Sequence, residues 1–168
     1  EGKGVDLKTA LSMDVLNTLV DGEPYKLEEI QLLPVVPNPG KILCVGLNYD
    51  SHRKEAGREE KEHPAIFTRY ADTLIAHGDP IIRPRVSTKL DYEGELALVI
   101  GKPGRNIPEE DALDYVTGYA CFNDASIRDW QKHNIQFTPG KNFPGTGAFG
   151  PYLITPDEVG NLEEQRVI

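Results

Sequence analysis

The sequence predicts a single α+β domain that is rich in β-structure. Its 168 residues are enough for one domain with a hydrophobic core and a small appendage. Sixteen Gly and thirteen Pro residues indicate many turns and short elements, which suit strands better than a helical bundle. Short apolar runs bounded by polar residues, Gly or Pro have the length and composition of strands, at residues 41–45, 65–67, 116–122 and 152–154.

The chain divides into an N-terminal segment, residues 1–38, and a domain over residues 39–168. A cluster of breaker residues, Pro37-Asn38-Pro39-Gly40, marks the boundary between them. The first segment is predicted to contain a short helix from about Leu7 to Leu19. In the domain, residues 41–45 form a continuous apolar run of the kind a fully buried strand shows, and Gly46 ends it.

Charge and composition exclude several classes of partner. Lys and Arg number 18 and Asp and Glu 27, and the resulting net charge of −9 argues against binding to nucleic acid or an anionic membrane. No apolar run approaches the roughly 18 residues that a membrane span needs, and the opening Glu-Gly-Lys-Gly lacks a secretory pattern. We therefore expect a cytoplasmic protein. Cys44 and Cys121 lie in apolar stretches, which predicts reduced, buried thiols without a catalytic role.

An acidic segment, Asp-Tyr-Glu-Gly-Glu followed by Leu-Ala-Leu-Val-Ile, occupies residues 91–100. If it is one strand, Asp91, Glu93 and Glu95 share a face, at a spacing of about 6.6 Å that makes their charges repel. A divalent cation among them would remove this repulsion, and Mg²⁺, Mn²⁺ and Ca²⁺ prefer oxygen ligands. A solvated acidic face fits this segment alone equally well.

Two further polar stretches offer candidate catalytic groups. After Gly46 a short helix is predicted in which His52 and Glu55 are neighbours, so that the carboxylate could orient the imidazole as a general base. A solvated surface pair is the commoner outcome of such spacing. The charged residues 57–62 behind the pair suggest a closing lid.

Another polar stretch follows the predicted strand at residues 116–122. A helix that begins near Asp124 would place Asp124, Arg128 and Gln131 on one face, although an N-cap aspartate paired with an arginine is the plainer interpretation. Residues 138–147 form a Gly/Pro-rich loop that contains Lys141 and lacks the spacing of a phosphate-binding loop.

Taken together, these motifs resemble the fumarylacetoacetate hydrolase family over residues 39–157. The resemblance rests on five stretches in order: Lys-Ile-Leu-Cys-Val-Gly-Leu-Asn-Tyr (41–49), Asp-Tyr-Glu-Gly-Glu-Leu-Ala-Leu-Val-Ile-Gly (91–101), Asp-Tyr-Val-Thr-Gly-Tyr (114–119), Asn-Asp-Ala-Ser-Ile-Arg-Asp-Trp-Gln (123–131) and Gly-Lys-Asn-Phe (140–143).

The resemblance implies a mixed β-sandwich or β-roll, a homodimer, and a bound Mg²⁺ or Mn²⁺, with Ca²⁺ as a further candidate. It also implies a small 2-keto or 1,3-diketo acid as substrate. The metal carboxylates of the family match Glu93, Glu95 and Asp124, and its lid dyad matches His52 and Glu55. Its substrate-contacting and active-site residues match Arg128, Gln131 and Lys141.

The expected activity is hydrolysis of a C–C bond in a diketo acid through a metal-stabilised enolate. Lys141 would stabilise the oxyanion and His52 would activate water. The same enolate serves decarboxylation, isomerisation or dehydration of a related 2-keto acid, and an idle small-acid-binding or dimerisation module is the third alternative.

The sequence departs from the family pattern in two places. Pro144 separates Phe143 from Gly145 and Thr146, so these two are left out of the predicted metal site. The chain stops at Ile168, short of the later family segment that completes the β-roll and pocket, so we expect it to be the N-terminal part of the catalytic domain.

Overall fold

The computed structural model of the chain describes residues 5–13, 15, 18, 22–55, 57 and 63–162, without the side chains of residues 51, 52 and 55. Its α-helices are α1 (Leu7–Ser12), α2 (Asp50–Glu55), α3 (Arg128–Gln131), α4 (Thr138–Lys141) and α5 (Pro156–Val159). The 3-10 helices are η2 (Leu27–Glu29), η3 (Ala71–Thr73) and η4 (Glu109–Tyr115). The strands are β1 (Ile42–Gly46), β2 (Ala65–Arg69), β3 (Leu74–Ile75), β4 (Leu90–Asp91), β5 (Gly94–Ile100), β6 (Val116–Asp124), β7 (Ser126–Ile127) and β8 (Gly147–Phe149).

The strands form one mixed sheet and two smaller antiparallel pairs. The sheet has the order β3-β8-β6-β5, in which β3 and β8 run parallel and the other neighbours antiparallel. The small pairs are β1 with β2 and β4 with β7. The predicted α+β, β-rich class is confirmed.

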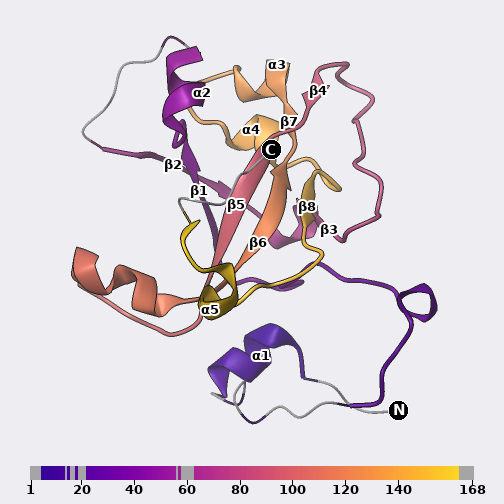
Figure 1. Cartoon of the computed structure of the whole chain (residues 1–168). Helices are drawn as coiled ribbons and strands as arrows, with labels where there is room; N and C mark the ends of the chain where they lie inside the picture. The colour runs from indigo at the N-terminus through magenta and orange to yellow at the C-terminus, as the bar shows by residue number, and fades with distance from the viewer. Residues whose placement is uncertain are drawn as a thin grey trace.

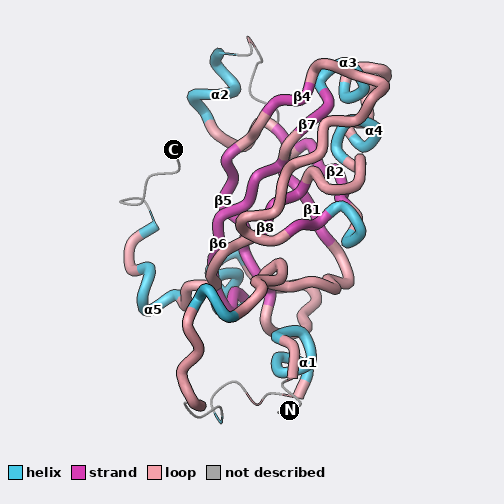
Figure 2. The backbone as a smooth tube through the Cα atoms, turned by 90° about the vertical axis from the view of Figure 1, so that its right-hand side faces the viewer, coloured by secondary structure: helices cyan, strands magenta, loops and turns pink. Residues whose placement is uncertain are grey.

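The helices divide between the two ends of the sheet. Figure 1 shows α2, α3, α4 and the β4–β7 pair at one end, and α1 and α5 toward the other. The turned view in Figure 2 shows the same division. The first end is also where β5 begins and β6 ends, because the two strands are antiparallel with Gly94 opposite Asn123. Residues from β5, β6, α3 and α4 therefore meet at one place.

The hydrophobic core lies on one face of the sheet. Val36, Ala120 and Phe149 are buried there, and Ala97 and Val99 of β5 pack against them. The larger apolar side chains of β5 point the other way, since Leu98 and Ile100 are 47% and 62% exposed. Glu95, Ala97 and Val99 are every second residue of the strand, so their side chains point to the same side, which faces the core.

The N-terminal segment contacts this core. Leu7 and Val35 pack against the buried cluster, and the backbone N–H of Val35 donates to the carbonyl of Phe149 at 3.3 Å. Helix α1 begins at Leu7 as predicted and ends at Ser12. The expected continuation toward Leu19 includes residues outside the described part of the chain.

Several expectations of local structure are wrong. The run at residues 41–45 is a strand but is not fully buried, because Leu43 and Val45 are 64% and 42% exposed on one face of the β1–β2 pair. Cys121 is exposed rather than buried. The strand expected at residues 152–154 is reduced to one isolated bridge between Tyr119 and Ile154.

The acidic segment is not one strand. Residues 90–91 pair with β7, and residues 94–100 pair with β6, so the chain is irregular at Tyr92 and Glu93. Glu93 is held there by tertiary hydrogen bonds: its N–H donates to Oδ1 of Asn123 at 3.1 Å, and its carbonyl accepts from the N–H of Asp124 at 2.8 Å. Asp91, Glu93 and Glu95 therefore do not share the face of one strand.

No helix in the described part of the chain is long and apolar enough to cross a membrane.

Candidate active site

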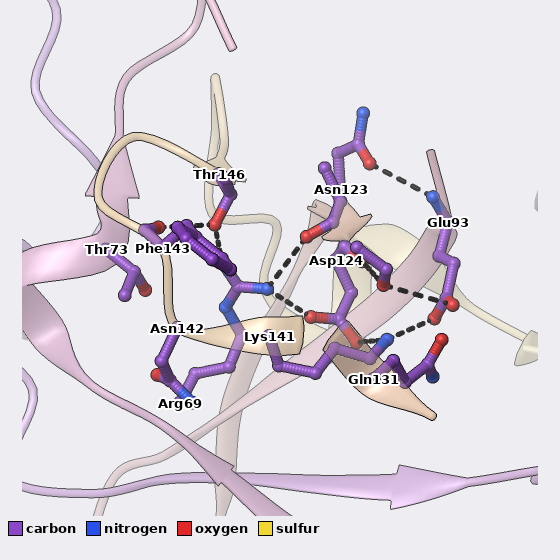
Figure 3. Close-up of polar contacts among 12 residues, drawn as sticks. Arg69, Thr73, Glu93, Asn123, Asp124, Gln131, Lys141, Asn142, Phe143 and Thr146 are labelled. Atoms are coloured by element: carbon purple, nitrogen blue, oxygen red, sulfur yellow. Dashed lines mark hydrogen bonds and ion pairs between the residues drawn. The ribbon is translucent and has the colours of Figure 1, made fainter. Parts of the chain in front are cut away.

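Two carboxylates meet where β6 ends. Asp124, the last residue of β6, is 3% exposed. Its backbone hydrogen bond to Glu93 brings the two side chains next to each other, and Figure 3 shows them on either side of the ammonium of Lys141. The hydroxyl oxygen of Ser126 lies 3.2 Å from Oε1 of Glu93 and 2.9 Å from the backbone carbonyl oxygen of Asp124, so its one proton can be donated to either acceptor.

Lys141 supplies a buried positive charge between these carboxylates. Its Nζ donates to Oε2 of Glu93 at 2.6 Å and to Oδ2 of Asp124 at 2.5 Å, and the residue is 1% exposed. Lys141 lies in α4 rather than in the expected loop. Helix α4 approaches α3 closely at Gly140, where a Cβ would lie 2.4 Å from the backbone N of Gln131. Only glycine fits that approach without a backbone shift.

Arg69, at the end of β2, is a second buried cation that the sequence analysis missed. Its Nη1 donates to Oδ1 of Asp124 at 2.6 Å, and its Nη2 donates to Oγ1 of Thr146 at 2.7 Å. Thr146, which the interruption by Pro144 had excluded from the site, is 0% exposed and lies beside it. The sequence did contain a signal for Arg69: it is a charged residue two positions after the apolar run of residues 65–67, at the end of the strand predicted there.

Glu95 is the third carboxylate, and its charge is poorly compensated. Its partial burial raises its pKa above the usual value, and the negative charges of Glu93 and Asp124 raise that pKa further. A hydrogen bond from Tyr49 and the charge of Lys141 act in the opposite direction but do not outweigh them. No ion pair to Glu95 is found among the described residues.

Tyr49 joins the segment before α2 to the strand that carries Glu95. Its hydroxyl accepts a hydrogen bond from the backbone N–H of Leu96 at 3.2 Å. Partial burial raises the pKa of Tyr49, the hydrogen bond from Leu96 lowers it, and the charge of Glu95 raises it further. Sequence reasoning did not single out Tyr49, although it lies in one of the motifs on which the family resemblance rests.

Arg128 and Gln131 lie at the rim of the carboxylate group. Arg128 pairs with Glu93, with Asp91 at 2.9 Å, and donates to Oε1 of Gln131 at 3.1 Å. Burial alone would lower the pKa of Arg128, but the two carboxylates raise it overall. Its side chain is 27% exposed, so the guanidinium remains within reach of a small ligand from solvent.

The expected helix from Asp124 is wrong. Asp124 ends a strand and Ser126 and Ile127 form β7, so α3 begins only at Arg128. Asp124 accordingly pairs with Arg69 and Lys141 rather than with the arginine four residues on. The reason is tertiary: Asn123 pairs with β5, Asp124 with β8, and Ser126 and Ile127 with β4, which keeps the backbone extended.

The predicted helix that carries His52 and Glu55 is present as α2. The side chains of both residues lie outside the described part of the structure, so their pairing stays a prediction. Residues 56 and 58–62 of the expected lid also lie outside it. The segment leading into α2 is anchored beside Glu95 through Tyr49.

The donor set suits a hard divalent cation. Three carboxylates supply oxygen ligands, and a cation would offset both the burial and the neighbouring negative charges that raise the pKa of Glu95. In the geometry described, the oxygens of Glu93 and Asp124 are bonded to protein cations instead. Within the described residues, His, Cys, Asp and Glu side chains form no group of three placed to hold a metal ion. An ion bound between Glu93 and Asp124 would take the position that the Lys141 ammonium holds.

Cys44 lies near the same charges and is half-buried rather than fully buried. Burial raises the pKa of its thiol to about 12, and the charge of Asp124 adds to the effect. The thiolate is therefore disfavoured at neutral pH.

A separate hollow of about 400 Å³ lies beside α3 and α4. None of the carboxylates lines it, so the hollow and the charged site are different places. Its lining residues are Trp130, Gln136, Thr138, Pro139, Asn142 and Phe143.

Comparison with known proteins identifies the family. The family model described as Fumarylacetoacetate (FAA) hydrolase C-terminal matches residues 41–167. The chain belongs to the fumarylacetoacetate hydrolase family.

Curated relatives and solved structures agree with this assignment. The chain is 43% identical to the oxaloacetate tautomerase YisK of Bacillus subtilis, over 85% of this chain and 49% of that protein. It is also 43% identical to the mitochondrial oxaloacetate tautomerase fahd2 of Xenopus laevis, over 79% of this chain and 42% of that protein. The chain thus spans about half the length of the curated relatives it matches.

Among solved structures, fumarylacetoacetate hydrolase from Exiguobacterium antarcticum is 35% identical with a TM-score of 0.72, covering 88% of this chain and 55% of that one. The 5-carboxymethyl-2-hydroxymuconate delta-isomerase of Mycobacterium smegmatis is 32% identical with a TM-score of 0.70, covering 80% and 53%. These neighbours confirm the fumarylacetoacetate hydrolase type of fold.

Proposed function

We propose that this protein interconverts the keto and enol forms of a small 2-keto dicarboxylic acid of the oxaloacetate type. The observation that carries the proposal is the buried ammonium of Lys141 held between Glu93 and Asp124, with Arg128 at the rim. The names of two relatives at 43% identity support this reaction over the hydrolysis that the sequence first suggested.

The donor set supports a divalent cation as cofactor. Mg²⁺ or Mn²⁺ held by Glu93, Glu95 and Asp124 would polarise the 2-keto oxygen of the substrate and stabilise negative charge on it.

The charged residues have separate tasks in this proposal. When an ion binds between Glu93 and Asp124, the ammonium of Lys141 would be released from them. It would then place its positive charge where the enolate oxygen develops. Arg128 offers a planar pair of donors to a substrate carboxylate, and Gln131, bonded to Arg128, orients it. To bind the substrate in this way, Arg128 must exchange its contact with Asp91 for one with the ligand.

The proton transfer needs a base and no attacking water. The C3–H bond breaks, its proton passes to the base, and a proton is returned to the C2 oxygen, so the substrate is only isomerised. His52 is the candidate base, with Glu55 to orient it. Because Tyr49 anchors the start of this segment to β5, the helix that carries both residues begins beside Glu95.

Hydrolysis of a C–C bond in a diketo acid is the second candidate, and the named hydrolase among the solved structures favours it. It differs in requiring a water molecule that His52 activates. Decarboxylation and dehydration use the same enolate, and an inactive acid-binding module would bind ligand without turnover.

A substrate panel with Mg²⁺ and with EDTA tests the proposal. Oxaloacetate, an acylpyruvate and a hydroxymuconate would each be followed by ultraviolet absorbance and product analysis. The expected result is Mg²⁺-dependent loss of the oxaloacetate enol without release of CO₂. His52→Ala and Glu55→Ala should each lower kcat about 100-fold or more while leaving metal affinity unchanged. Acylpyruvate cleavage without tautomerisation would replace the proposal by the hydrolase alternative.

The oligomeric state is also a proposal. Leu43, Val45 and Ile66 leave an apolar surface on the β1–β2 pair, which supports burial in a homodimer. Sedimentation of the wild-type chain, compared with Leu43→Glu, tests this. The wild type is expected as a dimer and the variant as a monomer.

A further inference from the structure

Arg69 has no route to solvent. Its side chain is 0% exposed, so in this structure it cannot touch a substrate. Its Nη1 donates to Oδ1 of Asp124 at 2.6 Å and to the carbonyl of Ala125 at 3.3 Å, and its Nη2 donates to Oγ1 of Thr146 at 2.7 Å. Any contribution of Arg69 to the site therefore passes through these partners.

The guanidinium is also fixed by packing. Its carbon lies 5.8 Å from the centre of the Phe122 ring, and a Cβ at Gly147 would lie 3.1 Å from Nη2 and 3.2 Å from Nε. Within the described part of the chain, the Nε donor has no hydrogen-bond partner. An unpartnered buried donor is destabilising, so the contacts of the two Nη atoms are the ones that hold the guanidinium in this orientation.

The two oxygens of Asp124 have different partners. Oδ1 is bonded to Arg69 and Oδ2 to Lys141, as Figure 3 shows. We propose that Arg69 is a positioning residue of the active site, which holds Oδ1 of Asp124 so that Oδ2 faces Lys141 and any cation bound by the carboxylates. The catalytic part of this inference rests on the proposed function, whereas the metal-binding part does not.

Thr146 extends the same role to the segment that follows Lys141. Its hydroxyl accepts from Arg69 and donates to the carbonyl of Phe143 at 2.6 Å, and its N–H donates to the carbonyl of Thr73 at 3.2 Å. One guanidinium thus sets Asp124 and the turn behind Lys141 relative to each other. A lysine at position 69 would carry its charge on one nitrogen, so it could not hold Asp124 and Thr146 at the same time in the fixed geometry of a guanidinium.

Four variants and one control test the inference. Arg69→Met removes the contacts and Arg69→Lys keeps only the charge. Thr146→Val removes the hydroxyl at nearly constant shape, and Thr146→Ser retains it. Arg105→Met is the control. Arg105 is exposed in the loop that follows β5, at the opposite end of that strand from Glu95. Each protein would be titrated calorimetrically with Mg²⁺ alone and with Mn²⁺ alone, and kcat and Tm would be measured.

The metal affinity is expected to fall about 10- to 100-fold in Arg69→Met, the range for losing a group that orients a metal ligand. The metal affinity of Thr146→Val should lie between those of Arg69→Met and the wild type. The affinities of Thr146→Ser and Arg105→Met should equal that of the wild type. Arg69→Lys should recover only part of the loss. At saturating Mg²⁺, kcat should still be lowered in Arg69→Met, whereas a merely structural role would lower Tm alone.

Wild-type metal affinity in Thr146→Val and Arg69→Met, or a lower Tm with unchanged affinity and kcat, overturns the inference. Thr146→Val keeps the test open if Arg69→Met does not fold. If no protein converts oxaloacetate, the proposed reaction fails while the metal titrations still decide the role of Arg69. If even the wild type binds neither metal, a crystal structure of Thr146→Val decides. Displacement of Asp124 from Lys141 supports the inference and an unchanged contact overturns it.

Discussion

Nζ of Lys141 lies 2.5 Å from Oδ2 of Asp124, with 1% and 4% of the two side chains exposed. The pair joins the end of β6 to α4, two elements that are connected by no backbone ladder. Removing one partner from a buried ion pair leaves a charge without compensation in a poorly solvated place. The pair is therefore both a structural link and the centre of the candidate site.

The first prediction concerns this ammonium. Lys141→Met should lower the free energy of unfolding in EDTA by about 3 to 5 kcal/mol, as measured by urea denaturation. Added Mg²⁺ should raise the Tm of the variant more than that of the wild type, because the ion no longer competes with a tethered cation. Lys26→Met, at a side chain that is 72% exposed, is the control. If Mg²⁺ raised the Tm of both proteins equally, the ion and the Lys141 ammonium would not compete for the carboxylates.

The second prediction concerns Glu95 and pH. Because burial and the charges of Glu93 and Asp124 raise its pKa in the folded protein, its ionisation opposes folding. The penalty is absent below the pKa of the unfolded chain and grows as pH rises through the raised pKa. In EDTA, Glu95→Gln should therefore have a higher Tm than the wild type at pH 7, with a difference that disappears near pH 4. A difference that is constant with pH would refute the electrostatic cause.

The third prediction concerns Tyr49. Tyr49→Phe removes the acceptor of the Leu96 N–H and the hydrogen bond to Glu95. The free energy of unfolding should fall by about 1 kcal/mol, and the pKa of Glu95 should rise further, which a pH titration followed by NMR would detect. Tyr25→Phe is the matched control, since Tyr25 is 77% exposed. If both variants lost the same free energy of unfolding, the hydroxyl of Tyr49 would have no special role beside Glu95.

The fourth prediction concerns the contact between α3 and α4. A Cβ at Gly140 would lie 2.4 to 2.5 Å from backbone and side-chain atoms of Gln131, so one helix must move. Gly140→Ala should lower the free energy of unfolding by about 1 to 3 kcal/mol and weaken any activity that depends on Lys141. Gly40→Ala, where nothing lies within 4 Å, should change neither. Thermal denaturation and kinetics of the two variants would test this pair.

Sequence patterns predicted the class of fold. The structure also brings five of the predicted site residues together: Glu93, Asp124, Arg128, Gln131 and Lys141. Strands β1, β2 and β6 follow from local apolar runs, because the tendency of such a run to form a strand depends on its own composition, whereas its burial does not. The break at Tyr92 and Glu93 could not be predicted in this way. It depends on hydrogen bonds to Asn123 and Asp124, about thirty residues further along the chain.

The missed residues have the same explanation. Arg69 is 55 residues from Asp124 and 77 from Thr146 in sequence, so no helical or strand period relates them. Lys141 was found only through the family motif. Its place in the candidate site depends on its bonds to Glu93 and Asp124, which are distant from it in the sequence. Periodicity describes which face of an element is apolar, whereas these contacts depend on how separate elements are packed.

The Arg69 contact also bears on the order of events in folding. Arg69 belongs to the β1–β2 pair, which is hydrogen-bonded as a sheet of its own, whereas Asp124 belongs to the larger sheet. The ion pair can form only when the small pair has docked on the large one. Opening of β1–β2 would expose a charged arginine and release Asp124 in the same step. Amide protons of β1 and β2 should therefore exchange with deuterium together with those of Asn123 and Asp124 at the end of β6, as one cooperative unit that spans both sheets.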